Sequence, residues 1–157
     1  MKKLILLIAL PVFIVGCGST DGLQEFDPTG LNEELEKVSF QPQLPTELPF
    51  EVKQADLSRP PELQQPVNTL NFDFYGEGNE HLSLLTVNGS EVSSTSEEDY
   101  QEVEIDHISG GYFINDSGDQ TLRWQEGDIQ YVLKSMDQGS ESDVSKADLI
   151  KMAESFE

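Results

Sequence analysis

The two histidines of the chain are the first residues to weigh as catalytic groups. They are His81 and His107, and Asp106 and Ser109 lie beside the second one. These are the residue types of a Ser-His-Asp triad. Successive residues of a strand point to opposite faces, however, so Asp106 would not orient His107. The Gly-x-Ser-x-Gly pattern of a hydrolase nucleophile is also absent. Both histidines are therefore predicted to be surface residues, and no catalytic residue is predicted.

Four of the five residues from Asn115 to Asp119 carry oxygen in their side chains. They suggest a calcium loop, but the spacing and the bidentate glutamate of an EF-hand are missing, so a turn is predicted. The run Glu97–Asp99 is predicted to be a solvated loop, with weak cation binding as the alternative. Cys17 is the only cysteine, which excludes an internal disulfide and a thiolate zinc site. Neither a metal nor a cofactor is expected.

The start of the chain has the pattern of an export signal. Lys2 and Lys3 precede an apolar stretch from Leu4 to Val15. A membrane-spanning helix needs about 20 apolar residues, so this stretch is too short and is typical of a signal-peptide core.

The run Ile14-Val15-Gly16-Cys17 resembles the lipobox of bacterial lipoproteins. The resemblance implies that the chain is cut before Cys17 and that a diacylglycerol, carrying chains such as palmitate, is attached to its thiol. Two acyl chains hold a protein stably at a membrane where one does not. The protein is therefore expected on the extracytoplasmic side of a cell membrane.

Thirty Asp and Glu outweigh nine Lys and Arg, for a formal net charge of −21. So acidic a chain is repelled by nucleic-acid phosphates and by anionic lipid headgroups. Nucleic-acid binding is therefore not expected. The acidity is interpreted as a means of keeping the protein soluble or as an adaptation to an alkaline or salty exterior. Recruitment of a basic or metal-ion partner is the alternative.

Four segments follow from the pattern along the chain. Residues 1–16 are the predicted signal peptide, and 17–30 a flexible tether after the lipidated cysteine. Residues 31–68 are predicted to form a short helix over 31–40 and a proline-rich extended segment, with a strand over 50–57. Residues 69–157 are predicted to form an antiparallel sheet and a terminal helix.

Period-two alternation dominates the last of these segments. Leu70, Phe72 and Phe74 alternate with polar residues. Further strands are predicted over 82–87, 102–106, 112–114, 122–124 and 129–133, with turns at 88–89, 110–111, 116–119 and 127–128. The short connections indicate a meander of about six or seven strands.

A C-terminal helix is predicted after Ser145, whose side chain can cap it, with Asp148 completing a capping box. Leu149, Ala153 and Phe156 share one face, with Ile150 beside them, so the helix should pack on one face of the sheet. The predicted fold class is α+β.

Aromatic side chains in the strands have two interpretations. Trp124 and Tyr131 are predicted to be core residues under the helix, and a ligand groove is the alternative. Arg123 is then expected on the opposite face, paired with nearby carboxylates.

Several runs together resemble the domain-of-unknown-function family 4367, which occurs in Bacillus-type envelope lipoproteins and at the outer ends of some anti-sigma factors. The resemblance covers 40–157 and rests on residues 42–45, 50, 52, 110–112, 122–127, 131–133, 144–145 and 153–156. It implies a sheet-plus-helix envelope protein similar to lipoprotein carriers and sigma-factor regulators, whose curved sheets cradle lipid or peptide. No catalytic residues are established for the family.

These observations favour a non-enzymatic, lipid-anchored binding or regulatory module with an envelope protein as its partner. The alternative is a carrier of a small ligand or lipid, with a cleft between sheet and helix. An enzyme would need polar groups converging in a pocket, and the sequence does not indicate them.

Overall fold

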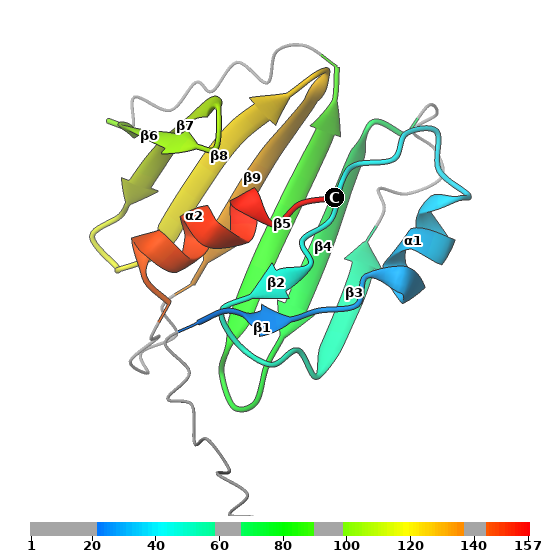
Figure 1. Ribbon diagram of the computed structural model, residues 1–157, viewed down its shortest axis with the longest axis horizontal. Helices are drawn as coiled ribbons and strands as arrows, with labels where there is room; N and C mark the ends of the chain where they lie inside the picture. Colours follow the sequence, from blue (N-terminus) through cyan, green and yellow to red (C-terminus); the bar gives the residue numbers. More distant parts are fainter. Residues whose placement is uncertain (1–21, 59–66, 90–98, 137–143) are drawn as a thin grey trace, which may run out of the picture.

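A computed structural model describes residues 22–58, 67–89, 99–136 and 144–157. It shows a large antiparallel sheet with the C-terminal helix and the N-terminal segment on the same face (Figure 1). The predicted signal peptide, Cys17 and the acidic residues Glu97 and Glu98 lie outside the described residues.

Seven strands form the large sheet, in the spatial order β3-β4-β5-β9-β8-β7-β6. Their bounds are β3 Gln54–Ser58, β4 Thr69–Tyr75, β5 His81–Asn88, β6 Gln101–Ile105, β7 Ile108–Ile114, β8 Gln120–Glu126 and β9 Ile129–Ser135. All neighbouring pairs are antiparallel, which confirms the predicted α+β class with a seven-stranded sheet. The meander is interrupted once: β9 pairs with β5, so two meanders join edge to edge.

Alternating side chains determine which face of the sheet is buried. Leu70, Phe72 and Phe74 of β4 are fully buried, as are Leu82 and Leu84 of β5. The intervening residues point to the other face. A slip of one residue in register would exchange these two sets, so the apolar pattern specifies the pairing.

Two of the predicted hairpin turns are confirmed, at 115–119 and at 127–128, where Gly127 has a positive φ of 59°. The turn predicted at Gly110-Gly111 is wrong. The chain turns instead at Asp106-His107, where Asp106 has a φ of 50°. Both glycines lie inside β7, and their lack of a side chain permits close approach there: a Cβ on Gly110 would lie 2.9 Å from the carbonyl oxygen of Arg123.

The predicted terminal helix is confirmed as α2, Lys146–Glu154. Ser145 accepts a hydrogen bond from the Asp148 N–H, and the Asp148 carboxylate accepts one from the Ser145 N–H, which completes the capping box. Leu149 and Ala153 are buried as expected, together with Met152, which the predicted stripe omitted.

The N-terminal segment corrects the predicted tether. Gln24–Glu25 form β1, which pairs with β2, Glu47–Leu48, so the second half of 17–30 is folded. The helix predicted over 31–40 is α1, Thr29–Leu35, with Leu31 and Leu35 buried. The strand predicted over 50–57 begins later in the structure, as β3 at Gln54. The chain before it contains Pro49 and packs Phe50 into the core, so it does not pair as a strand.

The core lies between the sheet and this outer layer. Leu44, Leu48 and Leu149 of the layer are fully buried, together with Leu122 and Leu133 of the sheet. The last residues are tied to the N-terminal segment, because Phe156 and Pro45 form an isolated bridge. In the part of the chain that the structure describes, no helix combines the length and the apolar character needed to span a membrane.

Candidate binding trough on the open face of the sheet

The residues considered for a catalytic triad are not assembled. Asp106 and His107 form the turn between β6 and β7, which corrects their predicted place in a strand, and His107 is exposed as expected. Ser109 donates its hydrogen bond to the Glu102 carboxylate at 3.1 Å. The hydroxyl is thus bonded to a carboxylate and not to a histidine.

His81 is more enclosed than a surface histidine was expected to be, with 14% of its side chain exposed. Its Nε2 lies 3.0 Å from Asp73 Oδ1, and its ring stacks on Tyr75 with centroids 4.7 Å apart. Ser83, two residues along the same strand, donates to Asn71 Oδ1 at 3.1 Å. These side chains join β4 to β5. None of these contacts pairs the Ser83 hydroxyl with the His81 ring, as a serine nucleophile and its base would require.

The loop considered for calcium is a turn, as predicted. Asn115 Oδ1 accepts hydrogen bonds from the backbone N–H groups of Ser117 and Asp119, both at 2.9 Å. This is the local bonding by which asparagine side chains stabilise turns. No cluster of three potential metal ligands occurs among the residues that the structure describes.

Trp124 and Tyr131 are core residues, as predicted, and are 5% and 2% exposed. Their rings stack, and Phe156 meets both edge-on. The Tyr131 hydroxyl accepts a hydrogen bond from the Gln43 N–H at 3.1 Å. Burial raises the pKa of Tyr131, so the phenol stays neutral over the physiological range. The space between this part of the sheet and the terminal segment is filled by these rings.

A trough of about 470 Å³ lies over β7, β8 and β9. Its floor is a row of paired residues, Gly110, Trp124 and Tyr131, whose side-chain directions point to the core. The alternate residues on either side of that row point the other way and line the trough: Ser109, Gly111, Arg123, Gln125, Gln130 and Val132. The trough therefore lies on the face of the sheet opposite to α2.

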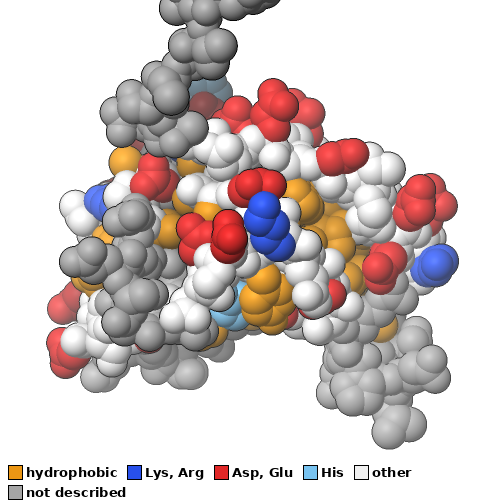
Figure 2. All heavy atoms as spheres, turned by 90° about the horizontal axis from the view of Figure 1, so that it is seen from below, with side chains coloured by type: hydrophobic (Ala, Val, Ile, Leu, Met, Phe, Trp, Pro, Cys, Tyr) orange, Lys and Arg blue, Asp and Glu red, His pale blue; other side chains and the backbone are white. Residues whose placement is uncertain are grey.

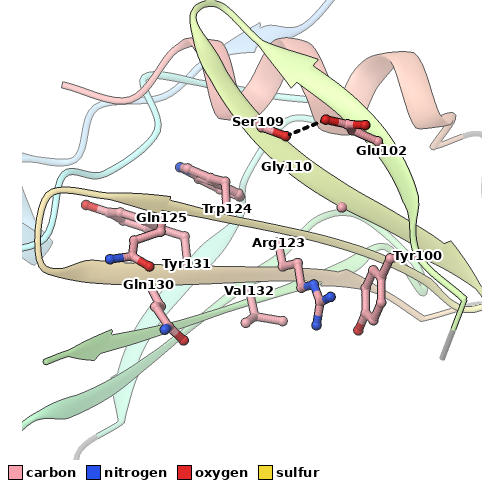
Figure 3. Close-up of a pocket in the computed structure, with 11 residues that line it drawn as sticks. Tyr100, Glu102, Ser109, Gly110, Arg123, Trp124, Gln125, Gln130, Tyr131 and Val132 are labelled. Atoms are coloured by element: carbon pink, nitrogen blue, oxygen red, sulfur yellow. Dashed lines mark hydrogen bonds between the residues drawn. The ribbon is translucent and has the colours of Figure 1, made fainter. Parts of the chain in front are cut away.

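Arg123 occupies a fixed place in the trough. Its guanidinium carbon lies 3.5 Å from the centroid of the Tyr100 ring, which is a close cation–π contact. Gly111, on the neighbouring strand, makes room for this stack, since a Cβ there would lie 3.1 Å from the Tyr100 ring and 3.2 Å from Arg123 Nε. Figure 3 shows Arg123 and Tyr100 together on one side of β8 and Trp124 on the other.

The expected pairing of Arg123 with carboxylates is not what the structure shows. Among the described residues, Lys53 forms an ion pair with Glu51, and His81 contacts Asp73. Arg123 contacts the Tyr100 ring instead. It does lie on the face of the sheet opposite to Trp124, as predicted.

The other trough side chains are mostly hydrogen-bonding groups. Gln125 and Gln130 are register partners on β8 and β9, and Val132 adds an apolar patch. Glu102 joins the trough to a second hollow of about 410 Å³, which Glu104 and His107 also line at the end of the β6–β7 hairpin. The arrangement offers donors, acceptors, one cation, one carboxylate and one apolar patch, which suits binding more than covalent chemistry.

Most of this trough was not predicted. The alternation along β8 correctly placed Arg123 opposite Trp124, and it also implies that Gln125 lies beside Arg123 on that face. Tyr100 and Glu102 reach the trough only because β6 pairs with β7. The sequence of one strand does not indicate which strand it pairs with.

Comparison with known proteins gives one match. No curated protein and no solved structure matches the chain. The profile of the family described as a domain of unknown function, DUF4367, matches residues 62–156, starting later than the resemblance implied. The matched region includes the whole trough and six of the seven strands of the sheet. The chain belongs to this family of domains of unknown function, DUF4367.

Proposed function

We propose that the protein is a lipid-anchored, extracytoplasmic lipoprotein of a bacterial cell envelope that binds a partner without catalysing a reaction. The binding surface is the trough on the open face of the sheet. The observation that carries this proposal is the fixed position of Arg123 on Tyr100 among side chains that face outward and can form hydrogen bonds. Such a preformed set of groups lowers the ordering cost of binding.

The anchor sets how this surface is presented. Acyl chains on Cys17 hold the chain at the membrane, while the excess of acidic residues repels anionic headgroups. Figure 2 shows acidic side chains over one side of the molecule, with few basic ones between them. The domain is thereby kept away from the lipid surface and is free to meet a partner.

The alternative, a lipid carrier with its cleft between sheet and helix, has less support. Leu149 and Met152 of α2 are fully buried, and the aromatic rings of Trp124, Tyr131 and Phe156 pack against one another. An acyl chain would have to displace these contacts, whose loss costs several kcal/mol.

Crosslinking in intact cells tests the binding surface. A photo-reactive residue in place of Gln125, which is exposed at the trough, should capture a partner. The same residue in place of Lys151, exposed on α2, is the matched control and should capture much less. Equal capture from the two positions, or capture from Lys151 alone, would contradict the proposed surface.

The anchor is tested separately by Cys17→Ser. Labelling with a clickable fatty acid should be lost, and the protein should no longer be retained at the membrane, because the thiol is the proposed acylation site. Labelling that persists in the serine variant would refute the anchor.

A further inference from the structure

Among the residues that the structure describes, Arg123 has no carboxylate partner, although the protein is strongly acidic. Thirty Asp and Glu and nine Lys and Arg make up the charged residues of the chain. Within the described ranges, neither the Lys53–Glu51 ion pair nor the His81–Asp73 contact includes Arg123, which contacts the Tyr100 ring. Because no described carboxylate forms an ion pair with this guanidinium, it is available to an anionic group from outside.

The stack on Tyr100 also sets the direction in which Arg123 can bind. The ring covers one face of the guanidinium, so its N–H groups remain available along the edge. A planar guanidinium edge matches a carboxylate, which it binds through two parallel hydrogen bonds. Because Gly111 leaves no side chain in the way, the trough beside this edge stays open.

The Glu102 carboxylate of the trough accepts a hydrogen bond from the Ser109 hydroxyl, and the other polar groups match the backbone of a peptide. Gln125 lies two residues after Arg123 on β8, and its register partner Gln130 lies two residues before Val132 on β9, on the same face of the sheet. Two residues of a strand span about 7 Å, which is also the length of two residues in an extended chain. A carboxylate at Arg123 therefore brings the peptide groups that precede it alongside the two glutamine amides, with an apolar side chain over Val132.

The charge of the whole protein narrows the choice of ligand. A net charge of −21 repels a polyanion or a partner surface rich in carboxylates. Among ligands that offer Arg123 an anionic group, the free end of an otherwise neutral peptide carries a single carboxylate and is repelled least.

We propose that the trough binds the C-terminal carboxylate of an extended, neutral peptide. Arg123 receives the carboxylate, and Gln125 and Gln130 bond to the peptide groups behind it. This rests on the proposed binding function and names the chemical class of the bound segment.

The test compares two small peptides on the mature lipidated protein in detergent micelles. N-acetyl-trialanine with a free carboxylate should shift the NMR signals of Arg123 Nε–H and the Gly111 amide in a saturable way. Its C-terminal amide should bind at least about tenfold more weakly, the loss expected for one charge-assisted contact. Arg123→Gln should abolish this difference, and Lys151→Gln should preserve it.

Equal binding of the acid and the amide would overturn the carboxylate assignment, and so would the absence of any shift with the acid. Neither result depends on capture of a partner at Gln125 in cells. Capture there with no preference for the acid refutes only the ligand class. Preference for the acid with no capture refutes the cellular binding function and retains the site.

Discussion

Trp124 and Tyr131 stack face to face across β8 and β9, with ring centroids 5.0 Å apart and planes inclined by 6°. Phe156 meets the two rings edge-on, at 5.2 and 5.6 Å. These three side chains join the sheet to the last residues of the chain. The same strands present Arg123 and Val132 to the trough on the other face, so this packing supports the candidate site from behind.

Trp124→Ala should destabilise the domain by about 3–5 kcal/mol, since it removes a buried ring with two aromatic partners. Urea unfolding followed by circular dichroism measures the loss. Gln125→Ala, at the next and exposed position, is the control and should change stability by less than about 0.5 kcal/mol. Equal midpoints for Trp124→Ala and the wild-type protein would contradict the packing role.

The two adjacent glycines of β7 should respond differently to alanine. Gly110→Ala places a Cβ 2.9 Å from a backbone oxygen, which cannot yield without moving β8, so stability should fall. Gly111→Ala meets only the side chains of Tyr100 and Arg123, which are able to shift. It should leave the urea midpoint nearly unchanged and move the NMR signals of the Arg123–Tyr100 stack. If Gly111→Ala lowers stability as much as Gly110→Ala, the stack is part of the structural core and not an adjustable site.

Deleting Ser145–Glu157 should unfold the domain. A helix of this length is marginal alone, and its removal uncovers the sheet face that Leu149, Met152 and Phe156 cover. Circular dichroism and dye binding on the truncated chain follow the change, with Lys151→Ala as the exposed control in the intact helix. A folded monomer with unchanged melting would show that the helix does not stabilise the sheet.

Stability should decline at alkaline pH because of Tyr131. Burial raises its pKa above the ordinary value of 10.0, although the Gln43 N–H partly offsets this. The folded state therefore holds its proton more tightly than the unfolded state. The contribution of the neutral Tyr131 phenol to the stability of the fold is complete below the pKa of tyrosine in the unfolded chain. It is lost as pH rises through the higher pKa of the folded state.

Tyr131→Phe should flatten the fall of the urea midpoint above about pH 10. Part of the fall should remain, because burial also raises the pKa of Tyr112. An unchanged slope in the phenylalanine variant would show that ionisation of Tyr131 is not coupled to folding.

Local patterns predicted the elements that depend on neighbours in sequence. The alternation of Leu70, Phe72 and Phe74 identified β4 and its buried face, and Ser145 with Asp148 identified the start of α2. Trp124 was correctly assigned to the core, since its strand alternates and its partner Tyr131 follows after a tight turn.

Relations between distant segments were not predictable in this way. The pairing of β5 with β9 brings together strands separated by three others in the chain, and nothing in either strand specifies the partner. The two glycines of β7 indicated a turn, because glycine is common in turns. They lie in the middle of a strand instead, where they allow close packing against β8. The trough depends both on the pairing of distant strands and on a glycine inside β7. Tyr100 reaches Arg123 across Gly111 only when β6, β7 and β8 are aligned.

The most direct test of the account measures partner capture from Gln125 in cells that carry Arg123→Gln. The substitution removes the cation on the open face and leaves the core rings on the other face in place. The account predicts that the crosslinked product is lost, while membrane retention and thermal melting stay at wild-type values. Undiminished capture by the Arg123→Gln protein would show that the trough around Arg123 is not where the partner binds.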